Sequence, residues 1–136
     1  MNQITTHYVT ENGACYEQYV ITDPAAKTAL TITPERGGMI TGFTLDGDEY
    51  IWTRRPNFSE CNRPRFGVPV LFPNCGGPDG GVHTFDGKAY PMENHGLADL
   101  CAWEVESVGP DGVSLVLEST PLTKFLYPFD FTLLVN

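Results

Sequence analysis

Three histidines, His7, His83 and His95, are the side chains best suited to proton transfer or to holding a polar ligand. A neutral imidazole donates one hydrogen bond and accepts another near neutral pH. His95 stands between Asn94 and Gly96, which favour a bent backbone that can turn a side chain inward. A lone histidine in a turn also has a purely structural interpretation. We expect His83 on the surface of a hairpin strand and His7 in a loose terminal segment.

Two arginines, Arg63 and Arg65, form the second candidate ligand group, within "NRPRFGVPVLFPNCGG" at 62 to 77. They precede a short apolar strand predicted for 68–72. The guanidinium group is a rigid fork of donors, which suits a hydroxylated or anionic ligand. The alternative is a solvated pair that offsets an acidic surface.

The sequence lacks the motifs of common hydrolases, nucleotide-binding proteins and zinc sites. There is no G-x-S-x-G elbow, no G-x-x-x-x-G-K-[ST] loop and no G-x-G-x-x-G turn, so a hydrolase triad and a nucleotide site have no support. The four cysteines are widely spaced and lack a histidine at zinc-ligand spacing, so we predict free thiols and no metal site.

Composition limits the partners and the location. Seventeen acidic against eight basic residues give a formal charge of −9, which repels nucleic acid and anionic membrane surfaces, so neither is an expected partner. No apolar run approaches the roughly 20 residues that cross a bilayer, and the first residues lack a secretory pattern. We expect a cytoplasmic protein whose residues 1–136 form a single domain.

The elements that must position these residues are predicted to be antiparallel strands. Short β-branched runs at 17–22 and 28–33 read as one hairpin. Further hairpin turns are predicted at Asp46-Gly47, at Asp86-Gly87 and at Pro110 to Gly112. No window shows a sustained helical period, so the fold class is all-β, an antiparallel β-sandwich. The irregular segment 54–81 is typical of a binding loop.

The last segment, "FLYPFDFTLLVN", is predicted to be a strand with one buried side. Phe129, Phe131, Leu133 and Val135 point to one face, and the strand stops without a turn or a polar tail. Either it is the final strand of a domain or the chain ends while a sheet is still being built.

Four stretches in this order resemble the aldose 1-epimerase (galactose mutarotase-like) family, and most closely its glucose-6-phosphate 1-epimerase-related branch: "PERGGMITGFTLDGDEYIW", "RPRFGVPVLFPNCGG", "FDGKAYPMENHGLADLCAW" and "YPFDFTLLV". The similarity runs from about residue 17 to the C-terminus. The "R-x-G-V-P-V-L-F-P" and "H-G-L-A" motifs are its most specific parts. The resemblance implies a β-supersandwich that interconverts the α and β anomers of an aldose or a sugar phosphate without cofactor or metal.

Carried over by position, the resemblance makes His95 a ligand of a sugar hydroxyl or of the ring oxygen at the catalytic site, where it helps to position the substrate. It also makes Arg65, and less directly Arg63, contacts to the sugar. In the family the general acid is a second histidine and the base a glutamate, and both follow the "YPFDF" strand. The chain is therefore expected to be the N-terminal part of a larger β-supersandwich that supplies the substrate-positioning side of the site. This chain alone is expected to lack the acid and base of the family, because that histidine and glutamate are not in it.

One departure from the family bears on the substrate. Many relatives read "H-G-F-A-R", whereas Asp99 stands here at the arginine position, and its charge would repel a phosphate. A neutral aldose is at least as compatible. The alternative function is a non-catalytic carbohydrate-binding module on the same fold. Such a module is expected as a stable monomer or as a homodimer that closes an exposed sheet edge.

Overall fold

The computed structural model describes residues 2–11, 13–52 and 66–136. The strands are β1 Gln3–Glu11, β2 Ala14–Asp23, β3 Thr28–Thr33, β4 Met39–Leu45, β5 Asp48–Glu49, β6 Val82–Phe85, β7 Lys88–Pro91, β8 Glu104–Gly109, β9 Gly112–Glu118 and β10 Thr132–Val135. The same residues include three short 3-10 turns, η1 Asp79–Gly81, η2 Ala98–Leu100 and η3 Thr123–Phe125.

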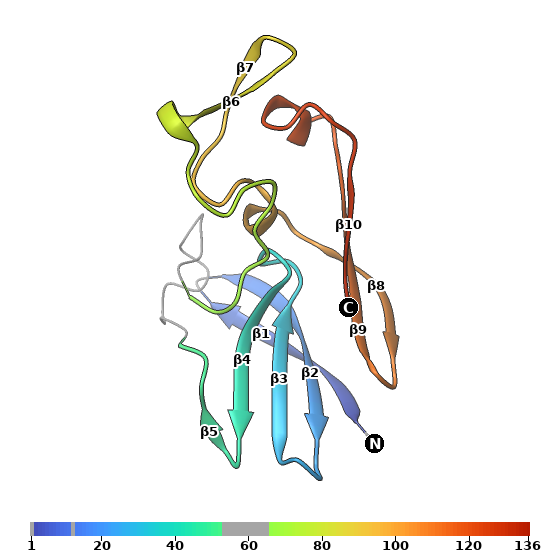
Figure 1. Cartoon of the computed structure of the whole chain (residues 1–136). Coiled ribbons are helices and arrows are strands. Elements are labelled where there is room, and N and C mark those ends of the chain that lie inside the picture. Colours follow the sequence, from blue (N-terminus) through green and yellow to red (C-terminus); the bar gives the residue numbers. More distant parts are fainter. Residues whose placement is uncertain (1, 12, 53–65) are drawn as a thin grey trace.

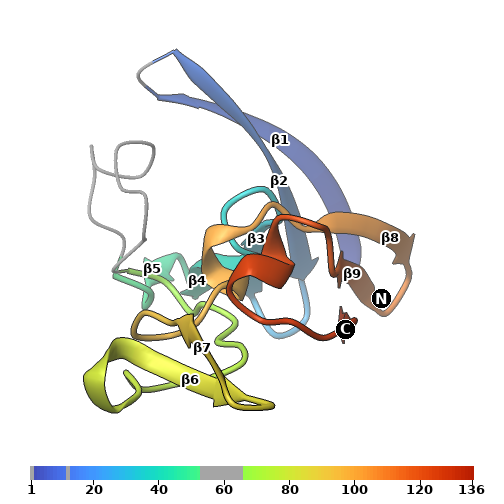
Figure 2. The same cartoon turned by 90° about the horizontal axis from the view of Figure 1, so that it is seen from above.

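The strands of the described residues form two main antiparallel sheets and a separate hairpin. One sheet has five strands in the order β1-β2-β3-β4-β5, and the other has three in the order β10-β9-β8 (Figure 1). The hairpin β6-β7 lies apart from both sheets, as the view from above also shows (Figure 2).

The main core lies between the two sheets. Its buried members are Ile32 from β3, Val113, Leu115 and Leu117 from β9, and Ala98 and Trp103 from the segment before β8. Partly buried apolar residues of β1, β2 and β10 pack against this cluster. Each sheet thus buries one face against the other, which confirms the predicted antiparallel β-sandwich.

The predicted Asp-Gly turns have the backbone that such turns need. Asp46 and Gly47 have φ of 52° and 90°, and Asp86 and Gly87 have φ of 49° and 76°. Positive φ at both central residues matches the twist of the flanking strands. These turns join β4 to β5 and β6 to β7, as expected.

The N-terminal segment and the segment 68–72 differ from prediction. His7 is not in a loose terminus, because β1 pairs with β2 along its whole length and His7 lies opposite Gln18. Residues 68–72 are not a strand. They make isolated bridges at their two ends, Ile40 with Val68 and Phe72 with Gly96.

An aromatic cluster connects the hairpin β6-β7 to the end of the chain. Phe85 of β6 contacts Tyr127 and Phe129 edge to face, with ring centroids 5.6 Å and 5.1 Å apart. Phe72 contacts Tyr127 edge to face and Phe131 with a tilted ring. Leu133 and Val135 pack with Phe131 against the main core, which confirms that the last strand has one buried side. The prediction was wrong for Phe129, which is 43% exposed and lies before β10.

Candidate functional site

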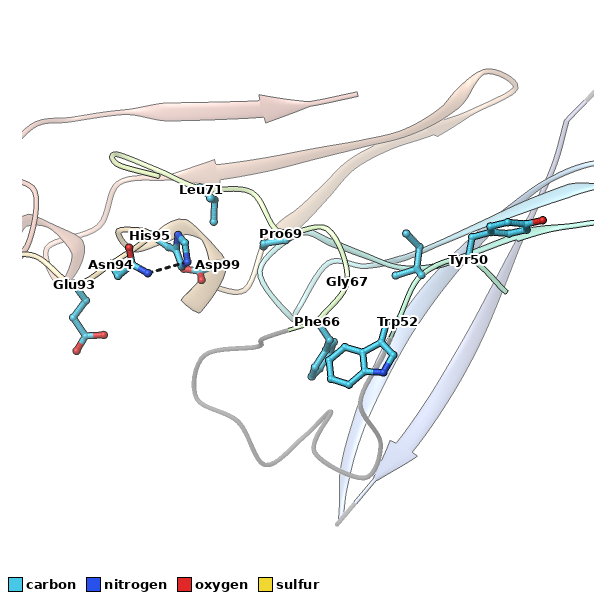
Figure 3. Close-up of a pocket in the computed structure, with 11 residues that line it drawn as sticks. Tyr50, Trp52, Phe66, Gly67, Pro69, Leu71, Glu93, Asn94, His95 and Asp99 are labelled. Carbon is cyan, nitrogen blue, oxygen red and sulfur yellow. Dashed lines mark hydrogen bonds between the residues drawn. The ribbon is translucent and has the colours of Figure 1, made fainter. Parts of the chain in front are cut away.

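A cleft of about 650 Å³ opens beside the end of β5. Its lining comes from three segments of the chain: Tyr50, Ile51 and Trp52; Phe66, Gly67, Pro69 and Leu71; and Glu93, Asn94, His95 and Asp99. His95 and Asn94 lie on one side of it, and Tyr50 and Trp52 lie on the other (Figure 3). The structure therefore places His95, the main histidine candidate of the sequence, in a cleft.

The turn that carries His95 is fixed by backbone contacts to the Phe72 segment. The Phe72 carbonyl accepts hydrogen bonds from the N–H groups of Leu97 and Ala98, at 2.7 Å and 3.2 Å. Gly96 has φ of 76° and lies directly against that carbonyl. His95 also has a positive φ, of 73°, which is uncommon for a residue other than glycine. The bent backbone that Asn94 and Gly96 indicate in the sequence is confirmed.

The imidazole of His95 has a hydrogen-bond partner at each nitrogen. Nδ1 lies 2.7 Å from the Cys75 carbonyl oxygen. The side-chain Nδ2 of Asn94 lies 3.0 Å from Nε2 (Figure 3). The ring is half-buried, so it is oriented by the protein and still borders the cleft.

Asn74 holds together the two loops that meet at His95. Its side-chain amide donates to the carbonyl of Gly76 and, at 3.1 Å, to the carbonyl of Glu93. The loop that provides the Cys75 carbonyl is therefore tied to the turn that provides the imidazole. Such outer contacts fix the geometry of a site without touching its ligand.

Below the His95 turn, Trp103 anchors the 3-10 turn η2. Its indole N–H donates to the Ala98 carbonyl at 3.0 Å, and its ring packs against Gly38. Asp99, in the same turn, lines the cleft with 2% of its surface exposed. Burial, and then the charge of Asp99, raise the pKa of the Cys101 thiol. A protonated thiol is a poor nucleophile, so Cys101 is unsuited to covalent catalysis.

The opposite side of the cleft is aromatic. Tyr50 and Trp52 are 62% and 66% exposed, although both are large apolar side chains. Phe66, by contrast, is buried against Met39 in a second small core. Exposed aromatic rings at a cleft are typical of binding surfaces, because they offer apolar area together with a polar group.

Of the site residues predicted from the sequence, the structure places His95 in the cleft. Arg63 and Arg65 lie outside the described residues, and their assignment to a sugar stays a prediction. His83 does not line this cleft and stacks on Phe85 instead, with ring centroids 5.9 Å apart. Sequence reasoning missed Tyr50 and Trp52 as site residues. The sequence signal that could have identified them is the presence of two aromatic residues, at positions 50 and 52, in the segment that follows the predicted Asp46-Gly47 turn.

Residues 2–11, 13–52 and 66–136 contain no group of three or more His, Cys, Asp or Glu that could hold a metal ion. They also include no helix with the length and hydropathy to cross a bilayer. Cys15, Cys75 and Cys101 are free thiols, as predicted, and Cys61 lies outside the described residues.

Solved structures with the same fold include galactose mutarotase-related proteins. The Slr1438 protein of Synechocystis sp. PCC 6803 matches with a TM-score of 0.82 and 28% identity, over 98% of this chain and 46% of its own. A galactose mutarotase-related enzyme of Lactobacillus acidophilus matches with a TM-score of 0.73 and 25% identity, over 86% of this chain and 37% of its own. A galactose mutarotase-like protein of Lactobacillus casei ATCC 334 matches with a TM-score of 0.72 and 25% identity, over 86% and 38%.

The chain spans less than half the length of each of these structures. Neither a protein-family model nor a curated protein sequence matches it. Its fold is that of the galactose mutarotase-like β-sandwich.

Proposed function

We propose that the chain forms the sugar-positioning side of an aldose 1-epimerase-like site, as the N-terminal part of a larger β-supersandwich. The observation that carries the proposal is the oriented imidazole of His95 in a cleft of a fold shared with mutarotase-related proteins. His95 binds the sugar, and Arg65 and Arg63 are proposed as further sugar contacts.

The reaction needs two proton transfers. A general acid protonates the ring oxygen as the bond to the anomeric carbon breaks, and a general base removes the proton of the anomeric hydroxyl. His95 is proposed to hold the sugar in place for these steps. The acid and the base are assigned to the remainder of a longer protein, consistent with matched structures more than twice the length of this chain.

The proposed substrate is a neutral aldose rather than a sugar phosphate. Two carboxyl residues, Glu93 and Asp99, lie in the described lining of the cleft. Carboxylates repel a phosphate dianion but accept hydrogen bonds from sugar hydroxyls. A neutral sugar also avoids the repulsion between an anion and a chain with a formal charge of −9.

Calorimetric titration of the chain with galactose and with glucose tests the positioning role. We expect one of the sugars to bind, and His95→Ala to weaken its affinity about tenfold, the usual loss for one hydrogen bond in a partly buried site. His83→Ala is the matched control, because His83 lies outside the cleft lining. Absence of binding to both sugars by the folded chain would contradict the proposal.

Polarimetry of freshly dissolved α-glucose and α-galactose tests where the acid and base lie. We expect the chain alone to leave the rate of mutarotation unchanged. Acceleration that His95→Ala abolishes and His83→Ala retains would show that the chain supplies its own acid and base. It would then be a complete isomerase rather than one side of the site.

A non-catalytic carbohydrate-binding module is the second candidate. The exposed rings of Tyr50 and Trp52 favour it, because they provide a surface for a sugar without providing an acid or a base. This alternative predicts binding that is lost in Tyr50→Ala and Trp52→Ala variants. It also predicts unchanged mutarotation when the rest of a longer protein is present.

A further inference from the structure

The contact of His95 with the Cys75 carbonyl determines which of its ring nitrogens carries the proton in the neutral ring. Nδ1 lies 2.7 Å from the carbonyl oxygen of Cys75. A carbonyl oxygen can only accept a hydrogen bond, so Nδ1 must carry the hydrogen. In a neutral imidazole the other nitrogen, Nε2, then has an unprotonated lone pair.

The contact at Nε2 is compatible with the same tautomer. The amide nitrogen of Asn94 lies 3.0 Å from Nε2, and an amide NH₂ group in this orientation donates to the Nε2 lone pair. An Nε2–H tautomer or an imidazolium ion would instead require the amide to turn so that its oxygen faces Nε2. The turn geometry holds the ring against both partners, because Gly96 packs on Phe72 and Asn74 ties the Cys75 loop to Glu93.

We propose that His95 is a dedicated hydrogen-bond acceptor and that Asn94 is a positioning residue that occupies Nε2 until a ligand hydroxyl takes its place. A neutral ring with its hydrogen on Nδ1 offers the cleft a lone pair and no donor. His95 therefore binds an O–H group of a sugar and not its ring oxygen, which could only accept. For the identity of the ligand, this inference rests on the proposed function.

The exchange between Asn94 and a hydroxyl is compatible with the burial of both side chains. Asn94 is exposed, so its amide can rotate toward solvent and remain hydrated. His95 is half-buried and held at Nδ1, so the ring stays in place when Asn94 leaves. The lone pair of Nε2 lies in the ring plane and accepts one good hydrogen bond at a time.

Long-range proton–nitrogen correlation spectra of the histidine rings test the tautomer without any ligand. His95→Ala identifies the His95 signals. At neutral pH we expect the Nδ1–H form, although a solvated histidine side chain prefers Nε2–H. Observation of the Nε2–H form, or of an exchanging mixture, would overturn the inference.

Two variants of similar shape test the contact of Asn94. Asn94→Asp replaces the donor by a carboxylate, which only accepts, so its contact with an unprotonated Nε2 should be lost and the ring signals of His95 should change. Asn94→Leu removes the contact but leaves Cys75, so the Nδ1–H form should persist. If both variants give the wild-type His95 spectrum, residue 94 does not act on Nε2.

Sugar analogues test the acceptor role itself. Each hydroxyl of the bound sugar is replaced in turn by hydrogen or by fluorine, and fluorine cannot donate. At one position both replacements should weaken binding about tenfold, and neither should matter in His95→Ala. Retained affinity of the fluoro sugar at the position where the deoxy sugar loses it would show that His95 donates. If neither parent sugar binds, the proposed function fails, while the spectra still decide the tautomer.

Discussion

Gly96 is the residue that determines most directly where His95 lies. A Cβ atom at position 96 would lie 2.1 Å from the Phe72 carbonyl oxygen, far inside contact distance, and the φ of 76° disfavours any side chain. We expect Gly96→Ala to lower the free energy of unfolding by more than about 3 kcal/mol, from backbone strain and overpacking together. Chemical denaturation monitored by the fluorescence of the buried Trp103 measures it.

A matched control separates these two causes. Gly87 has the same φ of 76°, but nothing lies within 4 Å of the position of its missing Cβ. Gly87→Ala should therefore cost only the strain, about 1 kcal/mol. Equal losses in the two variants would show that the close approach of Gly96 to Phe72 is unimportant.

At the scale of single residues, the sequence predicts His95 better than it predicts the partners of His95. The bend follows from Asn94 and Gly96, which are its immediate neighbours. The acceptor for Nδ1 is a backbone carbonyl 20 residues away, at Cys75. Every residue has such a carbonyl, so no residue type indicates this contact, and only the folded loops bring it to the ring.

At the scale of elements, the hairpins were predictable where a turn has a chemical signal. Asp46-Gly47 and Asp86-Gly87 supply positive φ at adjacent positions, and both turns are as predicted. The hairpin β1-β2 was missed, although its sequence contains an Asn-Gly pair at 12–13. The segment 68–72 reads as an apolar strand but makes bridges only at its ends, because its neighbours come from distant parts of the chain.

An ion pair between η3 and the segment before β10 has a predictable response to pH. Lys124 Nζ lies 2.5 Å from Asp130 Oδ1, and Ser119 donates to the same oxygen at 3.2 Å. Lys124, and then Ser119, lower the pKa of Asp130. A carboxyl whose folded-state pKa is lowered adds stability above its unfolded-state pKa, and this stability is lost as the pH falls through the folded value.

Lys124→Met should therefore lower the melting temperature slightly near pH 7, since Asp130 is exposed and such pairs are weak. The difference from the wild type should shrink as the pH falls below the unfolded-state value of about 3.9, and it should disappear once the pH is below the lowered folded-state pKa of Asp130. Thermal unfolding followed by circular dichroism, at pH 7 and at an acidic pH below that folded-state pKa, measures it. Lys88→Met, which removes an ammonium from above the Tyr90 ring, should show no comparable pH dependence. A deficit of equal size at both pH values would exclude the ion pair as the cause.

At the scale of the whole molecule, the sheet β10-β9-β8 has an edge on which two copies of the chain could pair. Among the described strands, β10 has β9 as its one neighbour, so its outer edge offers backbone N–H and C=O groups for pairing. Leu134 on this strand is 56% exposed. An edge of this kind pairs readily with another strand, and two copies of β10 can pair antiparallel about a twofold axis.

We therefore expect a homodimer that sedimentation velocity detects and that Leu134→Lys dissociates, because two buried lysines would face each other across the axis. Val108 is the matched control. It is 51% exposed on β8, at the other edge of the same sheet, so Val108→Lys should leave the dimer intact. If the wild type is monomeric, the homodimer is excluded. The partner of the β10 edge would then be another segment of a longer protein and not a second copy of the chain. Dissociation by Val108→Lys alone would move the dimer interface to β8.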